Sequence, residues 1–296
     1  MNKIFILICA LIQFLSLASC RQEQIKLLIG GSGWNKIAII DKDTKEIEWE
    51  YPLEKGWECN SVACTDDGNI LFSYSKGARL ISKDYKVIWD IKSPEGCEMQ
   101  TADVLSNGNI ILAWTGHPAV ILETDEKGNI ISRTEFETGI DNPHSQFRQV
   151  SKNSDGNYVI PIMGGDLIYE VSPKGIILNK ITPCSNYFTV LNENKENVYW
   201  VACGDKHILM KVDFTTGKVL EQIEQDDIEG VRLFFVAGLC KSENDGLYVC
   251  NWQGHDKDAI KSNSPQLFEI DKSLNVVWSL NDNTNFGMIS DVCIMK

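Results

Sequence analysis

The sequence predicts an all-β fold: a six-bladed β-propeller in which every blade has four antiparallel strands. Three observations predict it. A polar turn followed by an apolar strand recurs along the chain, a strand–turn–strand unit occurs six times, and an unpaired strand-like segment is left at each end. Repeats of about 40–50 residues built only of strands and turns are typical of propellers. Both repeats run through the 296 residues from near residue 25, so residues 21–296 are expected to form one domain.

The first repeat is clearest in Leu105–Trp114, where Asn107-Gly108-Asn109 forms a tight turn before an apolar run. The turn recurs, with steps of 40, 48, 40 and 50 residues, at Gly68, Gly108, Gly156, Glu196 and Gly246. The run after each turn is rich in the residues that favour strands. Each copy is therefore expected to connect the first and second strands of one blade.

The second repeat joins two β-rich runs through a turn of Asp, Ser, Pro, Gly or Asn. Its six copies occupy residues 38–49, 79–89, 120–131, 167–177, 209–220 and 267–278. These copies supply the third and fourth strands of six blades. For the second blade the combined repeats predict strands at 61–65, 70–74, 79–82 and 87–90.

The two ends of the domain complete each other. No first strand precedes Ile25–Ile29, and the chain ends on an extra strand-like segment, Asp291–Met295. We expect the C-terminal segment to pair with the N-terminal strands and close the ring, because closure removes exposed strand edges.

The N-terminus has the features of an export signal. Lys3 precedes an apolar run, Ile4–Leu17, that is too short to cross a bilayer but suits a signal peptide. The run ends in Leu17-Ala18-Ser19-Cys20, which resembles the lipobox of bacterial lipoproteins. That resemblance implies a signal at residues 1–20, a lipid on Cys20, and a location in the cell envelope, periplasmic or on the outer surface, with membrane contact only through the anchor. An ordinary secretory signal with an unrelated cysteine is the alternative.

Charge and cysteine content argue against several classes of partner and site. Without Lys3 the chain has 27 Lys and Arg against 41 Asp and Glu, a balance of −14, and no basic cluster. Nucleic acid is therefore not expected as a partner. No Cys-x-x-Cys pair is present, which argues against zinc-ribbon and thioredoxin-like sites. Cys240 and Cys250 flank a turn, so they form either a disulfide or two buried thiols.

The turn followed by tryptophan, at Trp49, Trp89 and Trp278, resembles the PQQ-like repeat of quinoprotein and outer-membrane-assembly propellers. The resemblance covers nearly the whole domain and implies that these side chains pack between blades. The chain departs from quinone-binding dehydrogenases in having six blades and no adjacent cysteine pair. PQQ is therefore not expected, and no cofactor is required.

Topology places the candidate site. In a four-stranded blade, the loops between the second and third strands and the links between blades lie on one face, where propellers bind ligands over the central channel. All four histidines of the chain fall in these segments. The residues predicted to bind a ligand there are Trp57, Glu58, Asn60, Glu98, Gln100, His117, His144, Arg148, Asn186, Trp252 and His255.

The favoured function is a monomeric binding or scaffold module that holds a small molecule, glycan or protein at the channel mouth. Aromatic side chains beside Asn and Glu suit a carbohydrate or a peptide. A scaffold that only binds proteins would instead expose an apolar patch on the outer rim.

Two enzymatic alternatives remain open. His144 with Arg148 is similar to the channel histidine of arylsulfotransferase-type propellers, which implies a histidine nucleophile for sulfuryl transfer. Glu58, Asn60, Glu98 and Asp291 resemble the oxygen-ligand set of lactonase-type propellers, which implies Ca²⁺. The sequence favours a binding protein over either.

Overall fold

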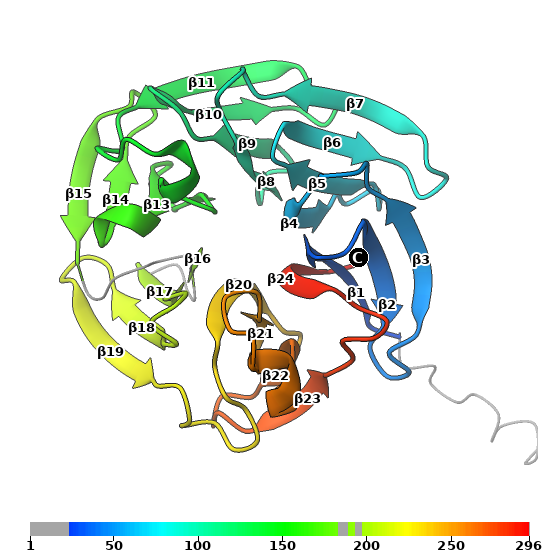
Figure 1. Cartoon of the computed structure of the whole chain (residues 1–296). Coiled ribbons are helices and arrows are strands. Elements are labelled where there is room, and N and C mark those ends of the chain that lie inside the picture. Colours follow the sequence, from blue (N-terminus) through cyan, green and yellow to red (C-terminus); the bar gives the residue numbers. More distant parts are fainter. Residues whose placement is uncertain (1–23, 183–188, 193–196, 296) are drawn as a thin grey trace, which may run out of the picture.

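A computed structural model describes residues 24–182, 189–192 and 197–295. Within these residues six four-stranded antiparallel sheets form a ring around a central channel, which confirms the predicted fold (Figure 1). The expected signal and its Cys20 lie outside the described residues. In the described part of the chain, no helix has the length and apolar character that crossing a bilayer requires.

The strand at the channel is the first of each blade and the strand at the rim is the last. The two inner strands of blades one to six are β24 Met288–Ile294 and β1 Lys26–Ser32, β4 Cys59–Cys64 and β5 Ile70–Tyr74, β8 Met99–Val104 and β9 Ile110–Trp114, β12 Ser151–Lys152 and β13 Tyr158–Ile162, β16 Thr189–Asn192 and β17 Val198–Ala202, and β20 Phe235–Lys241 and β21 Leu247–Trp252. The two outer strands are β2 Lys36–Asp41 and β3 Ile47–Pro52, β6 Gly77–Ile81 and β7 Val87–Lys92, β10 Ala119–Thr124 and β11 Ile130–Phe136, β14 Leu167–Val171 and β15 Ile177–Ile181, β18 Leu209–Asp213 and β19 Lys218–Ile223, and β22 Leu267–Ile270 and β23 Val276–Leu280.

The ring closes as predicted. β24 pairs antiparallel with β1, from Leu27 opposite Ile294 to Ser32 opposite Met288, with a bulge at Gly30 and Gly31. A Cβ on Gly31 would lie 1.9 Å from the Met288 carbonyl oxygen. The close approach of the two strands therefore requires glycine at this position.

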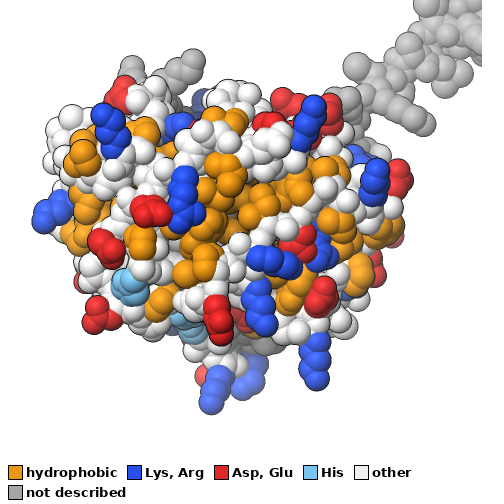
Figure 2. Space-filling model, turned by 90° about the horizontal axis from the view of Figure 1, so that it is seen from above, with side chains coloured by type: hydrophobic (Ala, Val, Ile, Leu, Met, Phe, Trp, Pro, Cys, Tyr) orange, Lys and Arg blue, Asp and Glu red, His pale blue; other side chains and the backbone are white. Residues whose placement is uncertain are grey.

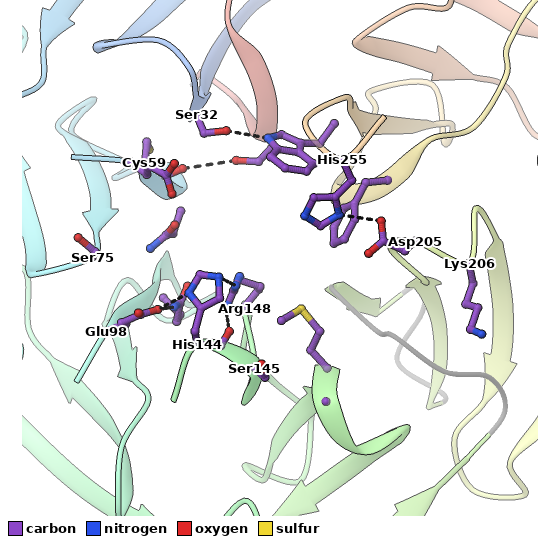
Figure 3. A pocket seen from close by; sticks show the side chains of 18 of the residues that line it. Ser32, Cys59, Ser75, Glu98, His144, Ser145, Arg148, Asp205, Lys206 and His255 are labelled. Atoms are coloured by element: carbon purple, nitrogen blue, oxygen red, sulfur yellow. Dashed lines mark hydrogen bonds and ion pairs between the residues drawn. The ribbon is translucent and has the colours of Figure 1, made fainter. Parts of the chain in front are cut away.

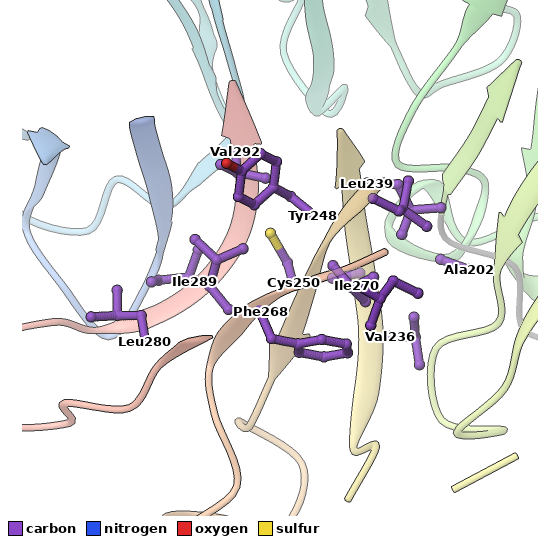
Figure 4. Packing of buried hydrophobic residues seen from close by; sticks show 14 of the residues in the cluster. Ala202, Val236, Leu239, Tyr248, Cys250, Phe268, Ile270, Leu280, Ile289 and Val292 are labelled. Carbon is purple, nitrogen blue, oxygen red and sulfur yellow. The ribbon is translucent and has the colours of Figure 1, made fainter. Parts of the chain in front are cut away.

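Burial explains the two strand patterns of the sequence. The middle strands are buried on both faces, as in β5 and β9, because neighbouring blades cover both sides of each sheet. The rim strand β3 alternates instead, because one of its faces meets solvent. In blade six, Phe268 and Leu280 pack with Ile289 and Val292 of the closing strand (Figure 4).

The predicted tryptophans join neighbouring blades. The indole N–H donates to the carbonyl of the second residue in the next blade's outer turn: Trp49 to Lys83 at 2.9 Å, Trp89 to Glu126 at 3.0 Å, and Trp278 to Lys42 at 2.6 Å. The repeated tryptophan is thus a structural residue, in agreement with its expected role.

Two further junctions use shorter side chains for the same bond. Thr134 donates to the Pro173 carbonyl at 2.8 Å, and Asn179 donates to the Phe214 carbonyl at 3.5 Å. Between blades five and six the residue at the tryptophan position is Glu221, which lies opposite Lys211 as Trp49 lies opposite Ile39. Its carboxylate has no hydrogen-bond donor and pairs with Lys211 at 3.4 Å. A cavity of about 610 Å³ lies at this junction, with Glu221 and Lys272 in its wall.

We expect Glu221→Trp to make the protein more stable than Glu221→Phe, since both variants lose the ion pair with Lys211 and both place a ring in the cavity. The indole would fill the cavity and donate to the Lys272 carbonyl, and one net hydrogen bond contributes on the order of 1 kcal/mol. For a domain of this size that is a rise in Tm of about 2–4 °C. Glu221→Phe, which fills space without a donor, is the matched control. Equal Tm values for the two variants would show that the bond does not form.

The structure corrects the alternative of a Cys240–Cys250 disulfide. Both residues are free thiols. The register of β20 and β21 places Cys240 opposite Tyr248, and Leu239 opposite Val249. The two cysteines are therefore not partners across the hairpin.

Apolar side chains also lie on the outer rim. Figure 2 shows hydrophobic side chains gathered in a band across the side of the ring where β7 and β11 lie, with charged groups around it. On β11, Ile130 is 64% exposed and Ile131 is 55% exposed. Patches of this kind on soluble proteins frequently mark interaction surfaces.

Candidate functional site

A cavity of about 750 Å³ opens at the channel mouth, on the face predicted from topology. Every blade contributes to its wall. One lining residue from each, in blade order, is Ser32, Glu58, Glu98, Arg148, Asp205 and His255.

The segment before β12 positions His144. Asn142, Pro143 and His144 begin a short 3-10 helix, η1 Pro143–Ser145, in which the Asn142 side chain accepts from the His144 N–H at 3.2 Å. Phe147 is fully buried beneath it. A capped, anchored turn therefore holds the imidazole at the cavity with little local freedom.

Glu98, His144 and Arg148 form a chain of polar contacts (Figure 3). The Glu98 Oε2 atom lies 2.9 Å from His144 Nδ1, and Arg148 Nη2 lies 3.0 Å from His144 Nε2. Arginine only donates, so Nε2 must accept and the imidazole proton must be on Nδ1, facing the carboxylate. Gln100 also donates to Glu98 Oε2, at 2.9 Å, and fixes that carboxylate.

Arg148 has unused binding capacity. Its Nη1 atom donates to the carbonyls of His144 and Phe147, at 2.6 and 3.3 Å. Among the described residues, no carboxylate lies within ion-pair distance of the guanidinium. Burial lowers the pKa of Arg148, and the negative charges of Glu98 and Glu58 raise it. The Nε–H and one Nη2–H remain available to a ligand in the cavity.

A second histidine–carboxylate pair lies on the opposite side of the cavity. His255 Nδ1 is 2.8 Å from Asp205 Oδ1 (Figure 3). The Trp252 ring meets His255 edge to face at 4.8 Å between centroids, and its N–H donates to Ser32 Oγ at 2.8 Å. Loops from three blades therefore fix this wall.

The structure places most predicted residues together and some elsewhere. Glu58, Asn60, Glu98, Gln100, His144, Arg148, Trp252 and His255 line the cavity. Trp57 stacks on Tyr74 with ring centroids 3.6 Å apart, outside the cavity lining. The His117 Nε2 atom contacts the Asp141 carbonyl at 2.9 Å instead. Asn186 lies outside the described residues.

Sequence reasoning did not select several lining residues. Asp205 and Lys206 lie in the loop before β18 and line the cavity. The histidine of the same loop, His207, does not line it and contacts the Phe234 carbonyl. Met163 begins η2 Met163–Gly165, and Asp166 follows it directly. The loop between β13 and β14 is only four residues long. Its Gly164-Gly165 pair, which allows a close approach of the backbone, was the one sequence feature that could have pointed to it.

The four residues predicted to bind Ca²⁺ lie in two different places. Glu58, Asn60 and Glu98 line the mouth, whereas Asp291 is 5% exposed on β24, outside the lining, and accepts from the Val62 N–H at 2.9 Å. Over residues 24–182, 189–192 and 197–295, no three His, Cys, Asp or Glu side chains are grouped to hold a metal ion. Calcium binding remains an untested prediction.

The sequence matches a family described as Mal s 1 allergenic protein-like over residues 33–275. Among solved structures it is 52% identical to a protein of unknown function from Bacteroides caccae, with a TM-score of 0.89, covering 93% of this chain and 100% of that one. No curated protein in the comparison matched the chain.

More distant structures share the fold. A catalytically inactive virginiamycin B lyase from Staphylococcus aureus, solved with quinupristin, has a TM-score of 0.54 at 14% identity and covers 87% of this chain and 74% of its own. A nidogen/laminin complex contributes a chain with a TM-score of 0.63 at 14% identity, covering 92% and 98%. At this identity the likeness extends to the propeller fold alone.

Proposed function

This chain belongs to the Mal s 1 allergenic protein-like family, and we propose that it binds a small organic anion at the channel mouth. The ligand is a carboxylate-bearing carbohydrate or short peptide. The anion contacts Arg148, and hydroxyl or amide groups of the ligand contact the surrounding polar side chains.

The unpaired guanidinium of Arg148 carries this proposal. A half-buried arginine without a carboxylate partner has lost hydration that an ion pair normally replaces. A ligand carboxylate can accept from the free Nε–H and Nη2–H as a two-point contact, which is stronger and more directional than a single bond. The cavity volume, about 750 Å³, falls in the range of small-molecule sites.

The contacts of His144 support binding over catalysis. A histidine that acts as nucleophile or general base needs a free lone pair. Here Arg148 occupies the Nε2 lone pair and Glu98 accepts from Nδ1–H. Sulfuryl transfer through His144 would first require Arg148 to move away, so we treat His144 as a group that orients Arg148.

Matched ligand pairs test the proposal by isothermal titration calorimetry. Glucuronate against glucose, and a dipeptide against its C-terminal amide, separate the two sources of carboxylate. We expect one acid to bind and its neutral partner to bind at least about tenfold more weakly, since a charge-assisted contact contributes about 1.5–3 kcal/mol. Equal binding of acid and neutral partner would refute the anion site. Repeating the titration with EDTA or Ca²⁺ tests the metal alternative.

The apolar rim supports a second candidate, a protein-binding scaffold. Ile130 and Ile131 on β11 and Ile176, Ile177 and Leu178 around β15 are exposed. Replacing Ile130 and Ile131 with Thr would abolish capture of a partner bound there and leave ligand titrations unchanged. Reduced ligand binding in that variant would argue against two separate surfaces.

For the location we propose export and lipid attachment at Cys20, on the sequence signal alone. Labelled palmitate should be incorporated by the chain and lost in Cys20→Ser. Incorporation that persists in the variant would exclude this anchor.

A further inference from the structure

Two cysteines meet where the ring closes. The channel strands β24 and β4 lie side by side and are joined at three levels. Ser290 Oγ donates to the Cys59 carbonyl at 3.4 Å, the Val62 N–H donates to Asp291 Oδ2 at 2.9 Å, and Cys64 Sγ donates to the Ile294 carbonyl at 3.3 Å. These contacts fix the position of one strand along the other.

At the last of these levels the Cys64 and Cys293 Sγ atoms are 3.7 Å apart. Neither forms a disulfide in this structure. A disulfide has an S–S bond of about 2.05 Å, so rotation of the two side chains has to bring the sulfurs closer by less than 2 Å. None of the seven cysteines in the described part of the chain is in a disulfide, so no other covalent link joins β24 to blade two there.

We propose that Cys64 and Cys293 form a reversible disulfide that locks the closing strand β24 to blade two. The two residues are 229 positions apart in the chain, so the bond would convert a noncovalent ring closure into a covalent one. Cross-links across long loops restrict the unfolded chain most.

The chemistry is thiol–disulfide exchange with a low-molecular-weight or protein disulfide as oxidant. Cys293 is partly exposed and Cys64 is 4% exposed, so Cys293 is the accessible nucleophile. Its thiolate attacks one oxidant sulfur and releases one thiolate. The Cys64 thiolate then attacks Cys293 Sγ in the mixed disulfide and releases the second thiolate. Two cysteine thiols lose two protons and two electrons, and the oxidant is reduced to two thiols.

Peptide mapping tests the lock. The purified protein is incubated with oxidised glutathione, denatured under acid, alkylated, digested and analysed by mass spectrometry. We expect one peptide that joins Cys64 to Cys293 and disappears on reduction with dithiothreitol. The oxidised protein should have a Tm about 5–10 °C above the reduced protein.

Serine variants provide the controls. Cys64→Ser and Cys293→Ser should lose both the joined peptide and the redox-dependent rise in Tm. Cys240→Ser should keep both, although Cys240 lies on the neighbouring channel strand β20. Full alkylation of Cys64 and Cys293 after oxidation, or a joined peptide containing Cys240, would overturn the proposal. The wild-type map decides the question even if a serine variant does not fold.

Discussion

Arg148→Met is expected to remove binding of the carboxylate ligand and leave binding of its neutral partner unchanged. Methionine keeps an unbranched apolar stem but removes the charge and both free N–H donors. Loss of a two-point contact to a charged group costs about 3 kcal/mol, which is a decrease in affinity of roughly 100-fold. Calorimetry with glucuronate and glucose, and with the dipeptide and its amide, measures the change.

Two other substitutions separate charge from folding. Arg133→Met removes an exposed arginine that pairs with Glu135 on β11, so it should leave affinity unchanged. Arg148→Lys keeps the charge without the planar two-point contact and should lose part of the affinity. An Arg148→Met protein that binds the acid as the wild type does would show that the anion contacts another group.

Asp291→Asn is expected to stabilise the protein near neutral pH and to flatten its pH dependence. Burial, with a smaller contribution from the charge of Asp103, raises the pKa of Asp291 from 3.8 to about 7. The unfolded chain therefore ionises this carboxyl from about pH 4, whereas the folded protein retains the proton up to about pH 7. The folded state binds more protons in that window, so the free energy of unfolding falls as pH rises from about 4 to about 7. At about 1.4 kcal/mol for each pKa unit the full loss is on the order of 4 kcal/mol.

The asparagine fits the existing contacts. Its oxygen can accept from the Val62 N–H, and its amide can donate to Gln149 after that side chain turns over, in place of the present bond from Gln149 to Asp291 at 3.1 Å. Urea unfolding at pH 4.5 and pH 7.5 gives the comparison. Asp84→Asn, at an exposed turn, controls for the loss of one negative charge. If the free energies of unfolding of wild type and Asp291→Asn differ by the same amount at both pH values, the pKa of Asp291 is not raised as described.

The sequence by itself determined the ring. Strands and turns follow from local patterns: the apolar runs predict buried strands, and the glycine turns predict the links between them. In the second blade the predicted 70–74 matches β5 Ile70–Tyr74, and the predicted 61–65 overlaps β4 Cys59–Cys64. The repeated tryptophan was also predicted to pack between blades, because a residue that recurs at one position of each blade meets the same part of the next blade each time.

Only the tertiary structure decided which loop side chains share the cavity. Topology placed Trp57 and His117 on the mouth face, but Tyr74 and Asp141 hold them away from the cavity. No short-range pattern identifies such partners.

The contacts that matter most join residues from different blades. Glu98 and His144 are 46 residues apart, Asp205 and His255 are 50 apart, and Cys64 and Cys293 are 229 apart. Local periodicity specifies strands and turns, because those depend on neighbours within a few residues. The direction of a loop side chain depends on the blade packed beside it, and that neighbour exists only once the ring has closed.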